Sequence, residues 1–225
     1  CNNRVSMTKL DASGCTALSS LSCYRNQLTS LDVSSCTKLT DLDCSTNPLT
    51  SLDVSSCAEL TALQCNNNPL TALDVTKNGK LEMLYCIGNQ LTSLDVTQNE
   101  VLWGLDCSNN ALTALDVSQN TVLENLSCSG QSVRLEVVRG ADETWSADLA
   151  ERVAGWKEHF ETITVSPEEV WDQQTDTVAW SKGTVQPVVA YNYDTGFEDP
   201  YTHSPVKMDV TLTLVPLGVG TEGDV

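Results

Sequence analysis

The sequence predicts a solenoid of short repeats with a parallel β-sheet on its concave side, followed by a smaller β-rich region. Two columns of leucines recur every 21 residues, the first at Leu28, Leu49, Leu70, Leu91 and Leu112 and the second three residues later, at Leu31, Leu52, Leu73, Leu94 and Leu115. Beyond residue 130 this period vanishes, and four of the five tryptophans appear: Trp145, Trp156, Trp171 and Trp180.

The repeat unit carries a specific motif. Residues 39–49 fit the pattern L-x-x-L-x-L-x-x-N-x-L, with Cys44 at the last strand position, and this is the signature of a leucine-rich repeat. A single unit cannot bury its own leucines, so neighbouring units stack and each contributes a short strand to one parallel sheet. Six units are counted through their strand cysteines: Cys23, Cys44, Cys65, Cys86, Cys107 and Cys128.

A column of asparagines follows the predicted strands. A side-chain amide at this place can satisfy backbone groups that the turning chain leaves unpaired. Gln131 takes the next equivalent position, and we expect the column to break and the array to end there. The column consists of Asn26, Asn47, Asn68, Asn89 and Asn110.

A column of aspartates has the same period, and each member stands two residues before a serine or threonine. In this context aspartate bonds to its own backbone two residues on, which fixes a turn. Stacked carboxylates binding calcium are the alternative. The column consists of Asp11, Asp32, Asp53, Asp74, Asp95 and Asp116.

The ten cysteines follow the repeat. Besides the strand column, Cys15, Cys36 and Cys57 form a second column that continues as asparagines. Side chains in register on parallel strands point the same way, so we expect buried, reduced thiols. No Cys-x-x-Cys pair occurs, and the sequence predicts no metal site. Cys1 fits the stub of one more unit, with a lipid-anchored N-terminus as the alternative, and we expect the natural protein to continue before it.

Outward-pointing strand positions should form the binding surface, because side chains alternate along a strand. The central outward column is Ser22, Asp43, Gln64, Tyr85, Asp106 and Ser127. Aromatic residues are enriched at binding hot spots, although packing between repeats would also account for them. The predicted ligand-binding residues are Tyr24, Arg25, Asp43, Gln64, Tyr85, Trp103 and Asp106.

We divide the chain into a solenoid at 1–130, a β-rich C-terminal cap domain at 131–215, either Ig-like or α+β, and a tail or linker at 216–225. Apolar residues alternate at Val133–Val137 and Val206–Leu214, and further strands are expected at Thr162–Val165, Asp176–Trp180 and Val185–Tyr193. Leu149, Val153, Trp156 and Phe160 recur at helical spacing, and Ser166–Glu169 fits a capping box.

Composition narrows the function. The net charge of −18 disfavours nucleic acid and anionic membranes as partners. No apolar stretch is long enough to insert into a membrane. The two histidines, His159 and His203, lie outside the repeats and outside any catalytic motif. We therefore expect a non-enzymatic binding module without a cofactor. A carbohydrate-active C-terminal domain is an alternative, because carboxylates are plentiful.

The repeat wording Leu28-Thr-Ser-Leu31-Asp-Val-Ser34 resembles that of internalin-like bacterial surface proteins, and the C-terminal segment from Trp180 to Thr213 is similar to β-rich domains that follow such repeats. The resemblance implies a secreted or cell-surface adhesion protein that binds a host-derived protein or glycan through concave aromatics, here Tyr24, Tyr85 and Trp103. The abundant cysteines depart from internalins proper. A spacer segment of a larger adhesin is the alternative function.

Overall fold

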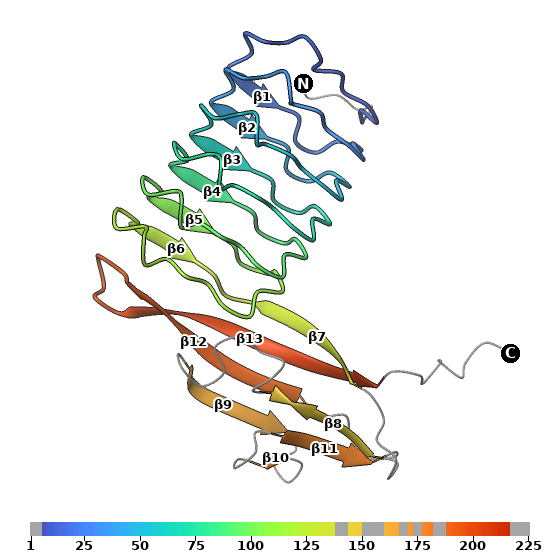
Figure 1. Cartoon of the computed structure of the whole chain (residues 1–225), viewed down its shortest axis with the longest axis vertical. Helices are drawn as coiled ribbons and strands as arrows, with labels where there is room; N and C mark the ends of the chain where they lie inside the picture. Colours follow the sequence, from blue (N-terminus) through green and yellow to red (C-terminus); the bar gives the residue numbers. More distant parts are fainter. Residues whose placement is uncertain are drawn as a thin grey trace, which may run out of the picture.

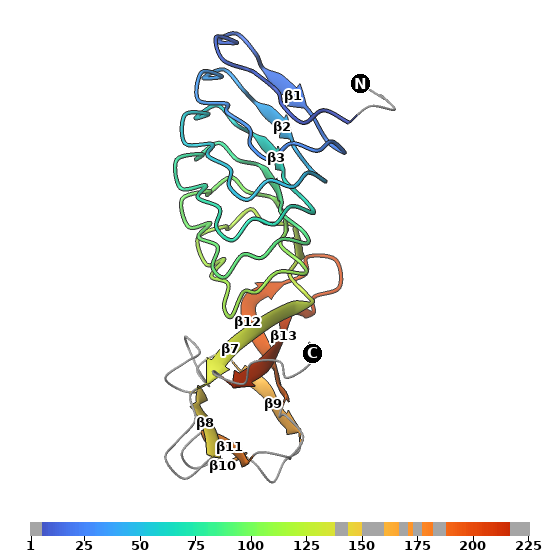
Figure 2. The same ribbon diagram turned by 90° about the vertical axis from the view of Figure 1, so that its right-hand side faces the viewer.

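The computed structural model describes residues 6–137, 144–149, 160–166, 171–172, 177–181 and 188–216. A solenoid of stacked coils forms the first part, and a region built from longer strands lies at its end (Figure 1). The short strands of the coils lie on one side of the solenoid, as the view turned by 90° shows (Figure 2).

Six parallel strands form the solenoid sheet, in sequence order. Equivalent residues of successive repeats pair directly, such as Leu21 with Leu42 and Leu63 with Leu84, so the 21-residue period sets the register of the sheet. This confirms the predicted leucine-rich-repeat solenoid. The strands are β1 (Ser20–Ser22), β2 (Asp41–Asp43), β3 (Ala62–Gln64), β4 (Met83–Tyr85), β5 (Gly104–Asp106) and β6 (Asn125–Ser127).

Stacked leucines fill the inside of the coils. The middle residue of each inner strand points inward, and Leu63 and Leu84 are fully buried. Burying one leucine side chain contributes about 1.5–3 kcal/mol. The cysteines from Cys23 to Cys128 lie in the same core, as predicted for small buried hydrophobes.

The asparagine column ties each coil to its neighbours. The Asn68 side-chain amide donates to the Cys65 carbonyl at 3.0 Å and to the Cys44 carbonyl at 3.2 Å, and its oxygen accepts from the Leu49 N–H at 3.1 Å. The predicted break at Gln131 is wrong. Gln131 donates to two carbonyls and accepts from the Leu112 N–H, each at 3.0 Å, because its longer side chain reaches the same groups from the start of the next strand.

The aspartate column makes turns, as predicted. In the repeats of Asp11, Asp32 and Asp53 the carboxylate accepts the N–H two residues on at 2.9 Å. Hydrogen bonds from the following serine or threonine hold the pKa of these carboxyl groups, and of Asp74 and Asp95, below the usual value.

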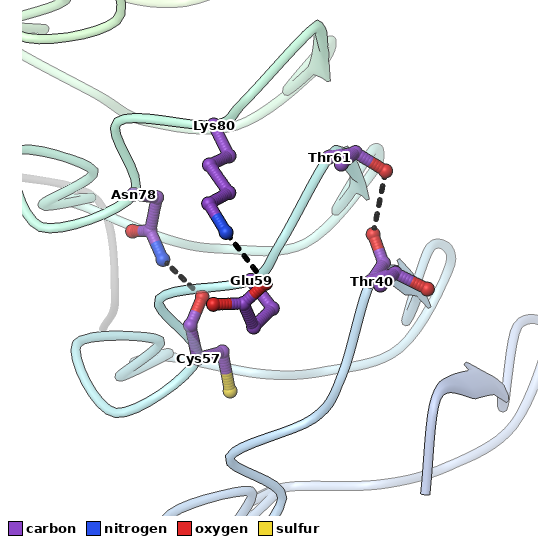
Figure 3. Close-up of polar contacts among 6 residues, drawn as sticks. All are labelled: Thr40, Cys57, Glu59, Thr61, Asn78 and Lys80. Atoms are coloured by element: carbon purple, nitrogen blue, oxygen red, sulfur yellow. Dashed lines mark hydrogen bonds and ion pairs between the residues drawn. The ribbon is translucent and has the colours of Figure 1, made fainter.

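A second set of contacts joins neighbouring repeats in the segments that lead into the strands (Figure 3). The Asn78 amide donates to the Cys57 carbonyl at 2.9 Å and to the Val54 carbonyl at 3.0 Å. The Lys80 Nζ atom donates to Glu59 at 2.6 Å, and the Thr61 hydroxyl reaches the Thr40 carbonyl at 3.1 Å. Each coil is thus bonded to its neighbours at several points around its circumference.

The C-terminal β region consists of two sheets. One has the order β7-β13-β12-β9, in which β7 and β13 run parallel and the other pairs antiparallel; the other sheet is antiparallel, with the order β10-β11-β8. The strands are β7 (Gln131–Val137), β8 (Thr144–Asp148), β9 (Phe160–Ser166), β10 (Trp171–Asp172), β11 (Thr177–Ser181), β12 (Val188–Glu198) and β13 (Pro205–Pro216).

Several sequence predictions for this region are corrected. Phe160 begins β9, where it pairs across from Tyr193, so it does not continue a helix. Strands β8 and β10 were not predicted, because neither has an extended alternation of apolar residues. Pairing with β7 extends β13 through Pro216, the first residue assigned to the tail. Leu149, another proposed helical position, is α-helical and buried. The remaining ones, Val153 and Trp156, and the capping box beyond Ser166 lie outside the described residues.

The C-terminal β region contacts the last coil of the solenoid directly. The Tyr191 hydroxyl donates to the Thr113 carbonyl at 3.2 Å, and the Cys128 thiol contacts the Lys207 carbonyl at 3.7 Å. Met208 and Val210 of β13 belong to the same buried cluster as the solenoid leucines. The apolar core therefore continues from the coils into the C-terminal strands.

Candidate binding face

The outward side chains of β1–β6 form one surface, which we call the concave face. On each strand the first and third residues point away from the core, while the middle leucine points into it. The concave face consists of Ser20, Ser22, Asp41, Asp43, Ala62, Gln64, Met83, Tyr85, Gly104, Asp106, Asn125 and Ser127.

An apolar patch lies at the middle of this face. The Tyr85 hydroxyl approaches the Met83 sulfur at 4.0 Å. A Cβ atom at Gly104 would lie in van der Waals contact with both residues, 3.9 Å from the Tyr85 hydroxyl oxygen and 3.7 Å from the Met83 Cγ atom. Ala62, the partner of Met83 on β3, is also small. Small residues on both sides thus leave the half-buried Met83 and Tyr85 accessible on the face.

Carboxylates with fixed orientations lie on the same face. Asp43 and Asp106 each accept a backbone N–H, from Ser45 and Ser108 respectively, at 3.0 Å. The Thr40 hydroxyl donates to Asp41 at 2.6 Å. The concave face as defined contains no lysine or arginine. A ligand would therefore meet preorganised negative charge beside an apolar centre.

The structure brings together some of the predicted binding residues. Gln64 and Asp106 pair directly with Tyr85 on the neighbouring strands, and Asp43 lies on β2 next to Gln64. Trp103 is half-buried and immediately precedes β5. Asp43, Gln64, Tyr85 and Asp106 therefore occupy equivalent outward positions on the four adjacent strands β2 to β5.

Tyr24 and Arg25 lie apart from this set, beyond the end of β1. Tyr24 is 46% exposed, and the Arg25 guanidinium lies 6.0 Å from the centre of its ring. Three strand spacings, about 14 Å, separate β1 from β4. The sequence analysis missed Met83, whose position two residues before Tyr85 across a buried leucine places both side chains on the same face.

The nine described cysteines carry free thiols. Eight are buried and only Cys15 is exposed. Burial raises the pKa of the Cys23 thiol to about 11 and that of Cys128 to about 12, and it raises the pKa of Cys65, Cys86 and Cys107 further. These buried thiols stay protonated at neutral pH, which makes them poor nucleophiles and metal ligands.

In the described part of the chain, no group of three or more histidine, cysteine, aspartate or glutamate side chains is placed to hold a metal ion. Within the same residues, no helix has the length and apolarity needed to cross a membrane.

The repeat, the parallel sheet and the residue columns define a leucine-rich-repeat solenoid, and its fold is similar to that of internalin-like proteins. Among solved structures, the chain is similar to the functional domain of InlJ from Listeria monocytogenes, which includes a cysteine ladder, with 28% identity and a TM-score of 0.52. That match covers 93% of this chain and 55% of the other, so the chain spans about half the length of that domain. The residues that match the repeat motif are the same ones that form the sheet and core described above.

Two further solved structures match with lower TM-scores. A leucine-rich-repeat protein of Leptospira interrogans is 26% identical over 52% of this chain and 33% of its own, with a TM-score of 0.49. An internalin-like protein of Listeria monocytogenes is 17% identical over 87% of this chain and 63% of its own, with a TM-score of 0.44. No protein-family model matches the sequence, and a search of curated proteins also finds no match.

Proposed function

We propose that the chain is a non-enzymatic binding module of a secreted or cell-surface bacterial protein, and that it recognises a protein ligand through its concave face. The observation that carries this proposal is the apolar patch of Met83 and Tyr85, left open by Ala62 and Gly104 and surrounded by fixed carboxylates. Interfaces combine an apolar centre with a polar rim in this way.

Trp103 extends the surface toward the edge of the sheet. Tryptophan and tyrosine are the residue types most enriched at hot spots, where truncation to alanine typically costs more than about 2 kcal/mol of binding energy. The half-buried state of both side chains limits the rotamer entropy that they lose when a ligand binds. Together they supply the anchors that a protein interface needs.

The test compares three forms of the chain as bait in host-tissue and mucus extracts, followed by affinity measurement with each captured protein after purification. The forms are the intact chain, the double variant Tyr85→Ala, Trp103→Ala, and a control double variant Val101→Ala, Val122→Ala. Val101 and Val122 are 46% and 49% exposed but lie outside the concave face, so they control for loss of surface apolar area.

We expect a purified partner to bind the intact chain and the valine variant equally and to bind the aromatic variant at least tenfold more weakly. Equal binding by all three forms would contradict a concave site. Absence of any partner would instead favour a spacer role within a larger adhesin.

A further inference from the structure

The hairpin between β12 and β13 has a well-ordered tip, residues 199–204. The Asp199 carboxylate accepts the backbone N–H groups of Tyr201 at 2.9 Å and of Thr202 at 2.7 Å. The Asp199 N–H donates to the Ser204 carbonyl at 2.9 Å, and the His203 N–H donates to the Asp199 carbonyl at 2.8 Å. All four bonds involve Asp199, which therefore closes the turn.

Tyr201 is displayed on this tip. Its side chain is 76% exposed, the largest exposed fraction among the large hydrophobic residues of the described part of the chain. A tyrosine held out on a rigid loop loses little conformational entropy on binding, which is the property that makes tyrosine effective in recognition loops. The hydrogen-bonded turn therefore presents an aromatic side chain to solvent.

The hairpin lies next to the last strand of the solenoid sheet. The Cys128 thiol contacts the Lys207 carbonyl at 3.7 Å, which places the start of β13 beside the residue that follows β6. A register shift between Asp194 and Phe197 marks a bulge in β12, and bulges bend a hairpin. Both views place the hairpin end directly below β6, on the side of the sheet (Figures 1 and 2).

Charge on the two surfaces has the same sign. Asp41, Asp43 and Asp106 lie on the concave face, and the hairpin adds Glu198 and Asp199 near Tyr201. The nearest cation of the hairpin is Lys207, whose side chain is half-buried. A ligand that covers both surfaces would bind more tightly if it carried positive charge. Arginine combines that charge with stacking on tyrosine rings.

We propose that the hairpin tip with Tyr201 is the second half of the recognition surface, and that the occupant is an arginine-rich protein segment lying across β4, β5 and β6 onto the hairpin. This inference rests on the proposed function of the concave face. Strands β4 and β6 are about 10 Å apart, and an extended segment of about eight residues spans roughly 26 Å, enough to reach from Tyr85 beyond β6.

The test uses a synthetic decapeptide with alternating arginine and glycine, and a matched peptide in which citrulline, the uncharged isostere, replaces every arginine. Binding is measured by calorimetry against the intact chain, Tyr201→Ala, Tyr201→Phe, Tyr85→Ala and the valine control. A benzophenone at one end of the peptide allows the contacted segment to be mapped by cross-linking and mass spectrometry.

We expect the arginine peptide to bind the intact chain and to cross-link within 198–206. Its affinity should fall about fivefold or more for Tyr201→Ala and for Tyr85→Ala, and Tyr201→Phe should keep the affinity of the intact chain. The citrulline peptide should bind at least tenfold more weakly than the arginine peptide. The affinity of the arginine peptide should fall as the salt concentration rises. Because Tyr201 is exposed, its variants should keep the melting temperature of the intact chain.

Two results would overturn the inference and differ in what they say of the concave face. Peptide binding that needs Tyr85 but not Tyr201 would remove the hairpin from the surface and leave the proposed function standing. Binding that is indifferent to both tyrosines, or absent, would reject the arginine-rich occupant, and the bait experiment with purified partners would then decide the concave face separately.

Discussion

One backbone position in every repeat has a left-handed conformation, and the residue that occupies it varies. The φ angle is positive at Arg25, Thr46, Asn67, Gly88 and Asn109, each 21 residues from the next. Glycine and asparagine adopt this conformation readily, whereas a branched side chain is strained there. Thr46, with a φ of 57°, is therefore the least suitable residue in the column.

We predict that Thr46→Asn stabilises the chain by about 1 kcal/mol and that the reverse exchange, Asn67→Thr, destabilises it by a similar amount. Both side chains are exposed, so packing contributes little to either change. Urea unfolding followed by circular dichroism measures both. Equal stability of the two variants would show that the left-handed position carries no strain.

The asparagine column predicts a larger effect. Replacing Asn68 by alanine leaves the buried Leu49 N–H without its acceptor. It also removes one of two amide donors from the carbonyls of Cys44 and Cys65, which keep their bonds to Asn47 and Asn89. We expect a loss of about 2 kcal/mol, since an unpaired buried group costs about 1–3 kcal/mol. Asn68→Asp, which keeps the acceptor but loses the donor, should also destabilise. A loss below about 0.5 kcal/mol in urea unfolding of Asn68→Ala would contradict this.

At the scale of the elements, Gln131 is the joint between the coils and the C-terminal strands. It is the first residue of β7, and it bonds to Cys107, Cys128 and Leu112 of the solenoid. Since β7 pairs with β13, a side chain that holds β7 to the last coil also holds the C-terminal sheet.

We therefore predict that Gln131→Ala lowers stability by about 2 kcal/mol and separates the unfolding of the two parts. Four of the five tryptophans lie beyond residue 140, so tryptophan fluorescence reports mainly on the C-terminal part, while far-ultraviolet circular dichroism includes the solenoid. The two probes should give different midpoints in the variant. Coincident transitions would show that the joint does not depend on this side chain.

The elements that the sequence predicts well are those with a strict period. Six strands, the buried leucines and the aspartate turns follow from residues that recur every 21 positions, and the strands of β12 and β13 follow from alternation. Phe160 was assigned to a helix because it continues the helical spacing of the apolar residues before it, but it is also the first apolar residue of β9. Met83 was missed, since methionine lacks the aromatic signal that drew attention to Tyr85 and Trp103.

For the whole molecule, the aspartate column makes stability depend on pH. Hydrogen bonds hold the pKa of Asp53, Asp74 and Asp95 below the unfolded value of about 4. At pH values between these lowered pKa values and about 4, the unfolded chain binds more protons than the folded chain. The stabilisation is complete above pH about 4 and is lost as the pH falls through the folded values.

We predict that thermal stability falls on acidification below about pH 4, and that a triple variant Asp53→Asn, Asp74→Asn, Asp95→Asn has a flatter pH profile because asparagine keeps the turn but does not titrate. Differential scanning calorimetry across this range measures it. A second triple variant, Glu82→Gln, Glu100→Gln, Glu124→Gln, removes three charges at exposed positions outside the column and controls for general repulsion. Parallel profiles for the intact chain and the triple variant would argue against the turns.

Because every coil has the same register, the length of the solenoid changes by a fixed step with each repeat. Inserting one 21-residue unit between β5 and β6 would preserve every column of leucines, cysteines and asparagines, because each coil bonds only to its neighbours. Such a change would move the Met83 and Tyr85 patch relative to the β12–β13 hairpin by about 4.8 Å per unit. The reach of the molecule can thus change by gene duplication alone, in fixed steps and without altering the chemistry at either end.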